Sequence, residues 1–105
     1  MDMATTDYIA GKEVEHLGLV RGNIVMTKHL GQDIMAGFKA IVGGEIQQFT
    51  ELLNDARNTA TERMVQEAQN LGADAIIMVR YATSQIMDPA AEVMAYGTAV
   101  RYKKP

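Results

Sequence analysis

Cysteine is absent from this sequence of 105 residues. Its absence excludes disulfide bonds, thiolate nucleophiles and zinc sites built from sulfur ligands. Long apolar runs are also missing, since none approaches the roughly 20 residues that a membrane-spanning helix needs. Residues 1–7 include two aspartates where a secretory signal has basic residues, and they lack an apolar core. We therefore expect a cytoplasmic protein that is neither exported nor inserted in a membrane.

The composition is that of one globular domain with little clustered positive charge. Hydrophobic residues make up 48% of the chain and charged residues 22%, which fits a single domain over residues 1–105. The net charge is −3, and the basic cluster of Arg101, Lys103 and Lys104 lies at the C-terminus. Binding to a nucleic-acid backbone needs basic residues gathered on a folded surface. We therefore expect no nucleic-acid partner.

A long amphipathic stretch forms the centre of the sequence. Apolar or small residues recur every three or four positions from Glu45 to Leu71, which predicts a helix with one face on a core. Gly72 follows, where the left-handed conformation of a helix cap costs glycine little. The apolar run after it, residues 75–79, is too short for a helix and is predicted to be a buried strand, with Asp74 holding the turn or capping the start of the strand. The helical stripe consists of Ile46, Phe49, Leu53, Ala56, Ala60, Met64, Ala68 and Leu71.

The segment before this helix predicts further elements. Residues 13–28 alternate in polarity, and Gly18 and Gly22 interrupt the rows, which predicts two strands or one strongly bent strand. Residues 30–42 repeat at helical spacing and predict a shorter helix. Gly43-Gly44 then allows a sharp turn into the long helix, so we expect a helical hairpin.

The C-terminal elements complete the predicted fold. Residues 75–84 and 92–102 flank a short polar turn and should pair as an antiparallel hairpin. The fold class is therefore α+β, an antiparallel sheet packed by a helical hairpin, in the order strands, helix, helix, strand, strand. The long final strand has apolar residues on both faces, and the glycine-interrupted early strands could bend to meet a neighbour, so an isolated subunit should need a partner. Proline at Val93 or Thr98 should weaken the resulting oligomer.

Three short stretches carry a resemblance to a known family. They are Gly37–Gly44, Leu71–Ala75 and Gly97–Val100. In order and spacing they resemble the YbjQ-like family of small bacterial proteins, often labelled heavy-metal-binding, and the resemblance extends over residues 8–102. It implies an α+β subunit similar to the dodecin subunit, assembled as a ring-shaped homopentamer.

The chain departs from this family at several polar positions. Family members commonly carry Arg-Asp after the middle glycine of the first helix, and an arginine followed by Ser and Tyr-Glu after the glycine pair. A cysteine often precedes the first strand glycine. If those groups form the family's site, it is rebuilt or lost here. The residues at these positions are Lys39, Ala40, Glu45, Ile46, Phe49 and Thr50, with Leu17 in place of the cysteine.

Candidate metal ligands are few. His16 and His29 are the two histidines, and they lack the spacing that places two ligands on one helical face. A metal site would need Glu13, Glu15 or Asp33 as well, or another subunit. His16 and His29 are therefore weak metal candidates, and we expect no cofactor.

The sequence leaves three hypotheses for function. It contains no nucleophile motif, and Gly43-Gly44 lacks the lysine and serine of a phosphate-binding loop. A non-enzymatic homo-oligomer that binds a small ligand or a metal in its ring is the leading hypothesis. The alternatives are an enzyme with a composite site between subunits, and an adaptor for another protein.

Overall fold

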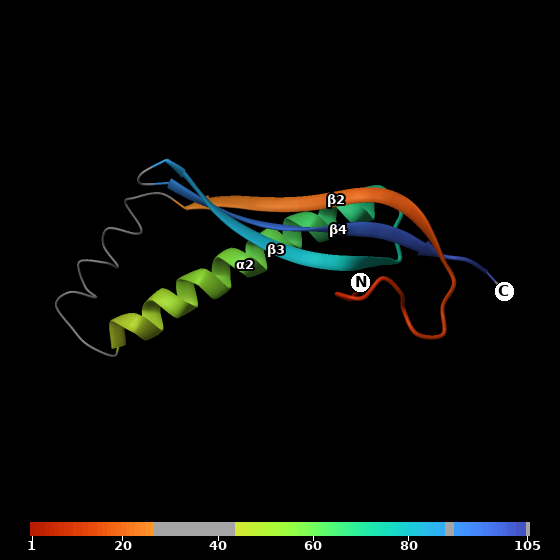
Figure 1. Ribbon diagram of the computed structural model, residues 1–105, viewed down its shortest axis with the longest axis horizontal. Helices are drawn as coiled ribbons and strands as arrows, with labels where there is room; N and C mark the ends of the chain where they lie inside the picture. Colours follow the sequence, from red (N-terminus) through yellow and green to blue (C-terminus); the bar gives the residue numbers. More distant parts are fainter. Residues whose placement is uncertain (27–43, 88–89, 105) are drawn as a thin grey trace.

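The computed structural model describes residues 1–26, 44–87 and 90–104, with the side chains of α2 described from Thr50 onward. Figure 1 shows a long helix lying across a sheet of long strands. Along the chain the elements are β1 (Asp2–Met3), β2 (Val14–Met26), α2 (Gly44–Asn70), β3 (Ala75–Met87) and β4 (Ala90–Tyr102).

The sheet has four strands in the order β1-β3-β4-β2. The central strand β4 pairs antiparallel with β3 on one side and with β2 on the other. The predicted hairpin of the last two strands is therefore confirmed. On the far side of β3, β1 pairs in parallel, with Asp2 opposite Ala75 and Met3 opposite Ile76.

The predicted helical hairpin on an antiparallel sheet is wrong. The sheet is mixed because β1 pairs in parallel with β3, and α2 is the one helix that packs on it within the described part of the chain. The helix predicted over residues 30–42 lies outside the described residues. The pairing of β1 had no signal in the sequence, because a strand of two residues has no periodicity of its own and is defined by hydrogen bonds to β3.

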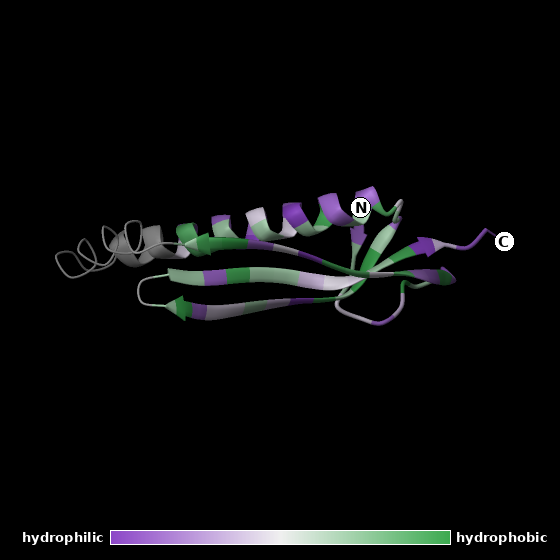
Figure 2. Ribbon diagram, turned by 90° about the horizontal axis from the view of Figure 1, so that it is seen from above, coloured by the Kyte–Doolittle hydropathy of each residue, from purple (hydrophilic) through white to green (hydrophobic). Residues whose placement is uncertain are grey.

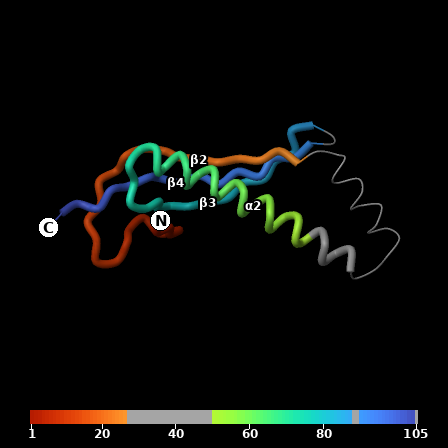
Figure 3. Tube along the Cα trace, turned by 180° about the vertical axis from the view of Figure 1, so that it is seen from behind, coloured from red at the N-terminus to blue at the C-terminus, as the bar shows by residue number. Residues whose placement is uncertain are grey.

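The stripe predicted on the long helix is confirmed at four positions, whereas Leu53 is half-buried and Leu71, which lies beyond the end of α2, is 44% exposed. Ala56, Ala60, Met64 and Ala68 are buried, at steps of four residues, and they form the core together with buried residues of β2, β3 and β4. Figure 2 shows α2 and the sheet as two layers, and Figure 3 shows α2 crossing the strands obliquely. Alanine at three of these four positions lets the helix backbone lie close to the sheet.

The closest approach of helix and sheet is at Gly22 of β2. A Cβ atom on this residue would lie 2.2 Å from the carbonyl oxygen of Ala60 and 2.3 Å from the backbone nitrogen of Met64. Real Cβ atoms do not come so close to backbone atoms, so only glycine fits between the strand and the helix. The glycine that interrupts the alternation of this strand therefore marks the point where α2 rests on the sheet.

The structure also agrees with the predictions made for the cap at Gly72, for Asp74 and for the bent strand. Gly72 has a φ of 77°, and its N–H donates to the carbonyl of Gln69 at 2.9 Å, which is a left-handed helix cap. The Asp74 carboxylate accepts the backbone N–H of Tyr102 at 2.8 Å and so fixes the start of β3 beside β4. β2 is one continuous strand with a bulge between His16 and Gly18, the bent-strand alternative of the sequence.

The N-terminal segment covers the other face of the sheet at one end. Ala75, Ile77 and Val100 form a second buried cluster, against which Ile9 and Val14 pack. The same end therefore has a layer on each face, with α2 on one side and the N-terminal segment on the other.

We expect Gly22→Ala to destabilise the fold strongly. Overpacking of a core costs about 1–3 kcal/mol, and here we expect about 3 kcal/mol because helix backbone must move. The measurement is urea unfolding at fixed protein concentration. Asn58→Ala, on the exposed side of α2, is the control and should change the free energy of unfolding by less than about 0.5 kcal/mol. Equal stability of the Gly22→Ala variant and the unmodified chain would contradict the proposed close contact.

Candidate functional site

The second half of β3 is an open sheet edge. The N-terminal segment pairs with the first half of β3. The Ala4 N–H donates to the carbonyl of Ile76 at 3.0 Å, and the Val79 N–H donates to the carbonyl of Ala4 at 3.0 Å. Beyond Val79, no other described segment pairs with β3 on this side. Residues 80–87 are exposed at every position. We call this stretch the β3 edge.

A bulge separates the covered half of β3 from the β3 edge. The register with β4 shifts between Ile77 and Arg80, and Met78 in the bulge has a φ of 55°. Met78 donates to the carbonyl of Thr6 at 2.9 Å. The Arg80 side chain donates to the carbonyl of Thr5 at 2.8 Å. These contacts hold the N-terminal segment beside the bulge, after which the segment turns away from β3.

The backbone groups that face outward on the β3 edge follow from the pairing with β4. The Val100 carbonyl accepts the N–H of Asp74, and the Tyr102 N–H donates to the Asp74 carboxylate. Both bonds run toward β3, so the even-numbered residues of β4 direct their backbone N–H and C=O groups toward that strand. Their partners Arg80, Ala82 and Ser84 are the ladder-bonded residues of β3. The alternate residues therefore direct their N–H and C=O groups to the open side. They are Tyr81, Thr83 and Gln85.

The β3 edge lacks the features that usually protect an edge strand. Lysine, proline and inward-pointing charges are the common devices, and residues 81–87 contain none of them. Tyr81, Ile86 and Met87 are 49%, 52% and 65% exposed. The Tyr81 hydroxyl shares a hydrogen bond of 2.8 Å with Thr61 of α2. This stretch is therefore chemically suited to receive another strand.

One of the strands that the sequence predicts to need a neighbour is not an edge strand. The final strand is that strand, because β4 is central and paired along both sides, whereas the early strand, also predicted to meet a neighbour, is the edge strand β2. A signal for the true edge was present in the uncharged stretch 81–87. That stretch reads equally well as an interior strand, so periodicity alone could not distinguish the two.

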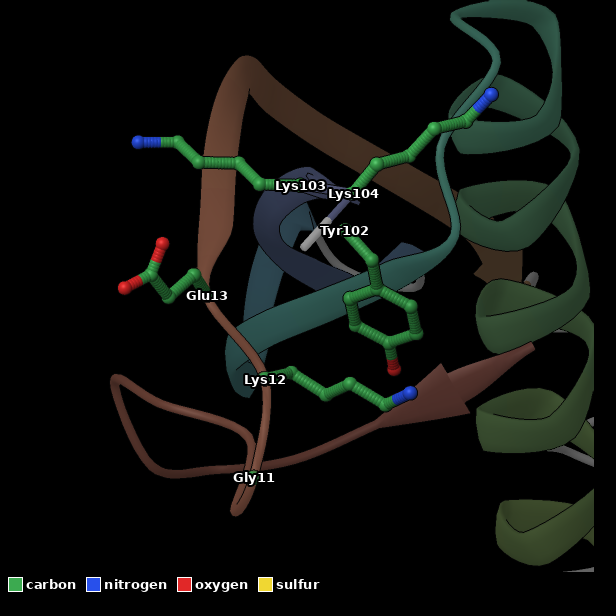
Figure 4. A pocket seen from close by; sticks show the side chains of 6 residues that line it. All are labelled: Gly11, Lys12, Glu13, Tyr102, Lys103 and Lys104. Carbon is green, nitrogen blue, oxygen red and sulfur yellow. The ribbon is translucent and has the colours of Figure 1, made fainter.

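A small cavity lies at the opposite end of the sheet. It measures about 370 Å³ and is lined by Gly11, Lys12, Glu13, Tyr102, Lys103 and Lys104. The Lys12 ammonium lies 5.1 Å from the centre of the Tyr102 ring. Figure 4 shows the lysine side chains pointing in different directions, so they do not converge on one anion.

Tyr102 is held by the N-terminus. Its hydroxyl donates to the Asp2 carboxylate at 2.5 Å. This hydrogen bond, then burial, then the negative charges of Asp2 and Asp74 raise the pKa of Tyr102 to about 12. The raised pKa therefore reflects a structural bond that ties the N-terminal segment to β4.

The predicted metal candidates are not gathered into a site among the described residues. His16 lies exposed on β2, as does Glu15, with Glu13 exposed just before the strand. No group of three potential ligands from His, Cys, Asp or Glu occurs in the parts of the chain that the structure describes. His29 and Asp33 lie outside those parts. The weak metal assignment for His16 and His29 stays a prediction.

Some of the positions that depart from the family pattern are described by the structure, and others are not. Lys39 and Ala40 lie outside the described residues. Glu45 and Phe49 belong to the first turns of α2, for which the backbone alone is described. Leu17, where the family often has cysteine, is partly buried against the α2 core. At Leu17 the chain therefore has a packing residue where the family often has cysteine.

Comparison with known proteins identifies the family. A family model described as "Putative heavy-metal-binding" matches residues 1–103. The chain belongs to this YbjQ-like family. It is 57% identical over 105 residues to a UPF0145 protein of Pseudothermotoga lettingae, covering 99% of both chains. It is 54% identical over 102 residues to a UPF0145 protein of Alkaliphilus metalliredigens, covering 97% of this chain and 99% of that one. The resemblance read from the sequence is therefore confirmed.

A solved structure supports the fold. A protein of unknown function of the DUF74 family from Pediococcus pentosaceus superposes with a TM-score of 0.68 at 15% identity, covering 98% of both chains. At this identity the likeness concerns the fold alone. As for membranes, α2 has 27 residues, but no helix in the described ranges combines the length and apolar character needed to cross a bilayer.

We expect Asp2→Asn to lower the pKa of Tyr102 from about 12 toward the ordinary value near 10. In the unmodified chain the unfolded tyrosine ionises first. The stabilisation from this bond is therefore complete below about pH 10 and is lost as pH rises toward 12. Ultraviolet titration of tyrosinate measures the change, and Tyr102→Phe identifies the signal. A high pKa that persists in Asp2→Asn would rule out this origin.

We expect zinc, copper and nickel at micromolar concentration not to bind stoichiometrically to the chain. The sequence offers no thiolate, and its two histidines lack ligand spacing. Isothermal calorimetry on the purified protein measures this. A tight site that disappears in His16→Ala or His29→Ala would show that the histidines do form a metal centre.

Proposed function

We propose that this protein is the non-enzymatic subunit of a homo-oligomer, assembled as a closed ring. The observation that carries the proposal is the β3 edge, which is exposed at residues 80–87 and uncharged from Tyr81 to Met87. Outward N–H and C=O groups on an unprotected edge are a template for pairing with another chain. A ring pairs such edges through one repeated contact and leaves none open.

The pentamer is the form of this ring that we propose. It comes from the resemblance to the YbjQ-like family, whereas the need for a partner comes from the geometry of β3. The two supports are independent of each other. A mass measurement tests both together, because it gives first whether the chain associates and then how many copies take part.

The family description adds a ligand to this proposal. A small ligand, or a metal bound more weakly than at micromolar concentration, would be held between subunits of the ring, because the described residues of one chain gather no set of three ligands. His16 supports this location, since it is exposed on the edge strand β2 where a neighbouring copy could add further ligands. Binding would then depend on assembly.

The proline positions chosen from the sequence do not test this assembly. Val93 and Thr98 lie on the central strand, where Val93 pairs with Ile24 and Thr98 with Leu19 and Ile77. Proline there removes a ladder hydrogen bond within the subunit, so it would weaken the fold itself. A useful variant must instead change an outward-facing backbone group of the β3 edge.

We expect Thr83→Pro to dissociate the oligomer while leaving the subunit folded. Its N–H points to the open side, so proline removes no bond to β4 but blocks pairing with a neighbour. Light scattering should give an oligomer mass for the unmodified chain and for the control Thr83→Ala, and a mass near the 11.5 kDa of the chain for Thr83→Pro.

Two results would count against the proposal. A mass of one chain for the unmodified protein at micromolar concentration would remove it. An oligomer that survives in Thr83→Pro would show that the β3 edge is not the contact. Circular dichroism of Thr83→Pro checks that the subunit itself keeps its helix and sheet.

A further inference from the structure

The sheet has a second free edge, on the strand opposite β3. β2 pairs with β4 on one side, and no other described strand pairs with its outer side. The odd-numbered residues of β4, such as Ala95 and Gly97, direct their backbone groups toward β2. Their partners Val20, Gly22 and Ile24 are therefore the residues of β2 that form the hydrogen bonds of the ladder. The outward-facing residues between them are Leu19, Arg21, Asn23 and Val25, all exposed. We call this stretch, residues 19–25, the β2 edge.

The β3 edge and the β2 edge lie at the same level of the sheet. Arg80 and Arg21 both pair with Tyr96, and Ser84 and Val25 both pair with Glu92. β2 and β3 also run in the same direction, because each is antiparallel to β4. Rotation of a copy about an axis along the strands would therefore bring one edge beside the other without a shift along the axis. That relation closes into a ring, whereas a translation of each copy along the ring axis would give an open helix. In a closed ring the strands tilt away from the axis, which staggers neighbouring strands along their own length without such a translation.

The β2 edge is lightly held by its own helix. The Arg21 N–H donates to the Glu67 carboxylate at 3.3 Å, and Arg63 donates to the carbonyl of Asn23 at 2.6 Å. Both helix side chains belong to exposed residues. These side chains can rotate into solvent when another strand pairs with β2. They therefore satisfy backbone groups of the free edge without blocking it.

The chemistry of the two edges fits a strand from a second copy. Apart from Arg80, the β3 edge carries no charge, and the β2 edge carries Arg21 alone. Two such strands can pair over most of their length without bringing like charges together. Arg80 and Arg21 meet only in the unshifted register, and the stagger that ring closure imposes on strands separates them.

We propose that the β3 edge of one copy pairs in parallel with the β2 edge of the next. This inference rests on the proposed ring and names the surface that receives the β3 edge. It makes the contact heterologous, so each copy gives one edge and receives another. Pairing of two β3 edges across a two-fold axis would be a different assembly, and it would end at a dimer.

A disulfide test separates these assemblies, because the chain has no cysteine of its own. Ser84 and Val25 lie on the face of the sheet away from α2, one on each edge, and both are exposed. Within one chain they are separated by β4, at roughly twice the strand spacing of about 4.8 Å, which is too far for a disulfide. In the double variant Ser84→Cys, Val25→Cys, any disulfide must therefore join two copies.

The expected result is a ladder of covalently linked chains, up to the full ring, after mild oxidation of the double variant. The two single variants should stay unlinked, as should a control with Asn58→Cys on the exposed side of α2. Because ring closure staggers the strands by an unknown number of residues, Asn23→Cys and Arg21→Cys replace Val25→Cys in two parallel double variants.

Each of the other possible outcomes would overturn one part of the proposal. A covalent dimer from Ser84→Cys alone would show that β3 edges pair with each other. An oligomer by light scattering, with no cross-link in any of the three double variants, would overturn the edge assignment and leave the proposed ring standing. A monomer by light scattering would overturn the proposed function itself.

Discussion

The contact between α2 and β2 at Gly22 is the constraint on which the rest of this structure depends. Two backbones meet there with no side chain between them, and Ala56, Ala60 and Ala68 keep the helix low over the strand on either side. Because the helix lies over β2 and β4, the buried residues of the sheet are concentrated under it. Burial on this face of the sheet follows from the approach at Gly22, whereas Ala75, Ile77 and Val100 are buried on the other face with Ile9 and Val14 packed against them.

The far half of β3 is left without such cover in the described part of the chain. Its first half is held on both faces and at its edge, by α2, by Ile9 and by the strand-like segment from Asp2 to Thr6. Beyond Arg80, which still bonds to the carbonyl of Thr5, the N-terminal segment no longer follows β3, and the Tyr81 hydroxyl keeps a hydrogen bond to Thr61 of α2. Exposure on both faces and along the edge is costly for an isolated subunit with an uncharged strand. Assembly is the physical answer that the proposed ring supplies.

The family description and the structure address different levels of function. The description names heavy-metal binding, whereas the chain has no cysteine and its described residues gather no group of three ligands, so that part of one chain offers little with which to bind such an ion. A site completed by a neighbouring copy would reconcile the two. In that case assembly comes first, and ligand binding is a property of the ring.

The sequence by itself determined the local elements: the buried stripe of α2, the cap at Gly72 and the hairpin of β3 and β4. These depend on residues close in the chain, so periodicity and turn chemistry contain them. Only the tertiary structure decided that β4 is central, that β1 adds to β3 in parallel, and that the far half of β3 stays open. Strand order is set by hydrogen bonds between distant segments, and an edge strand and an interior strand can have the same pattern of side chains. The sequence therefore predicted that the sheet needs a partner, and the structure shows which strand edges are open among the described residues.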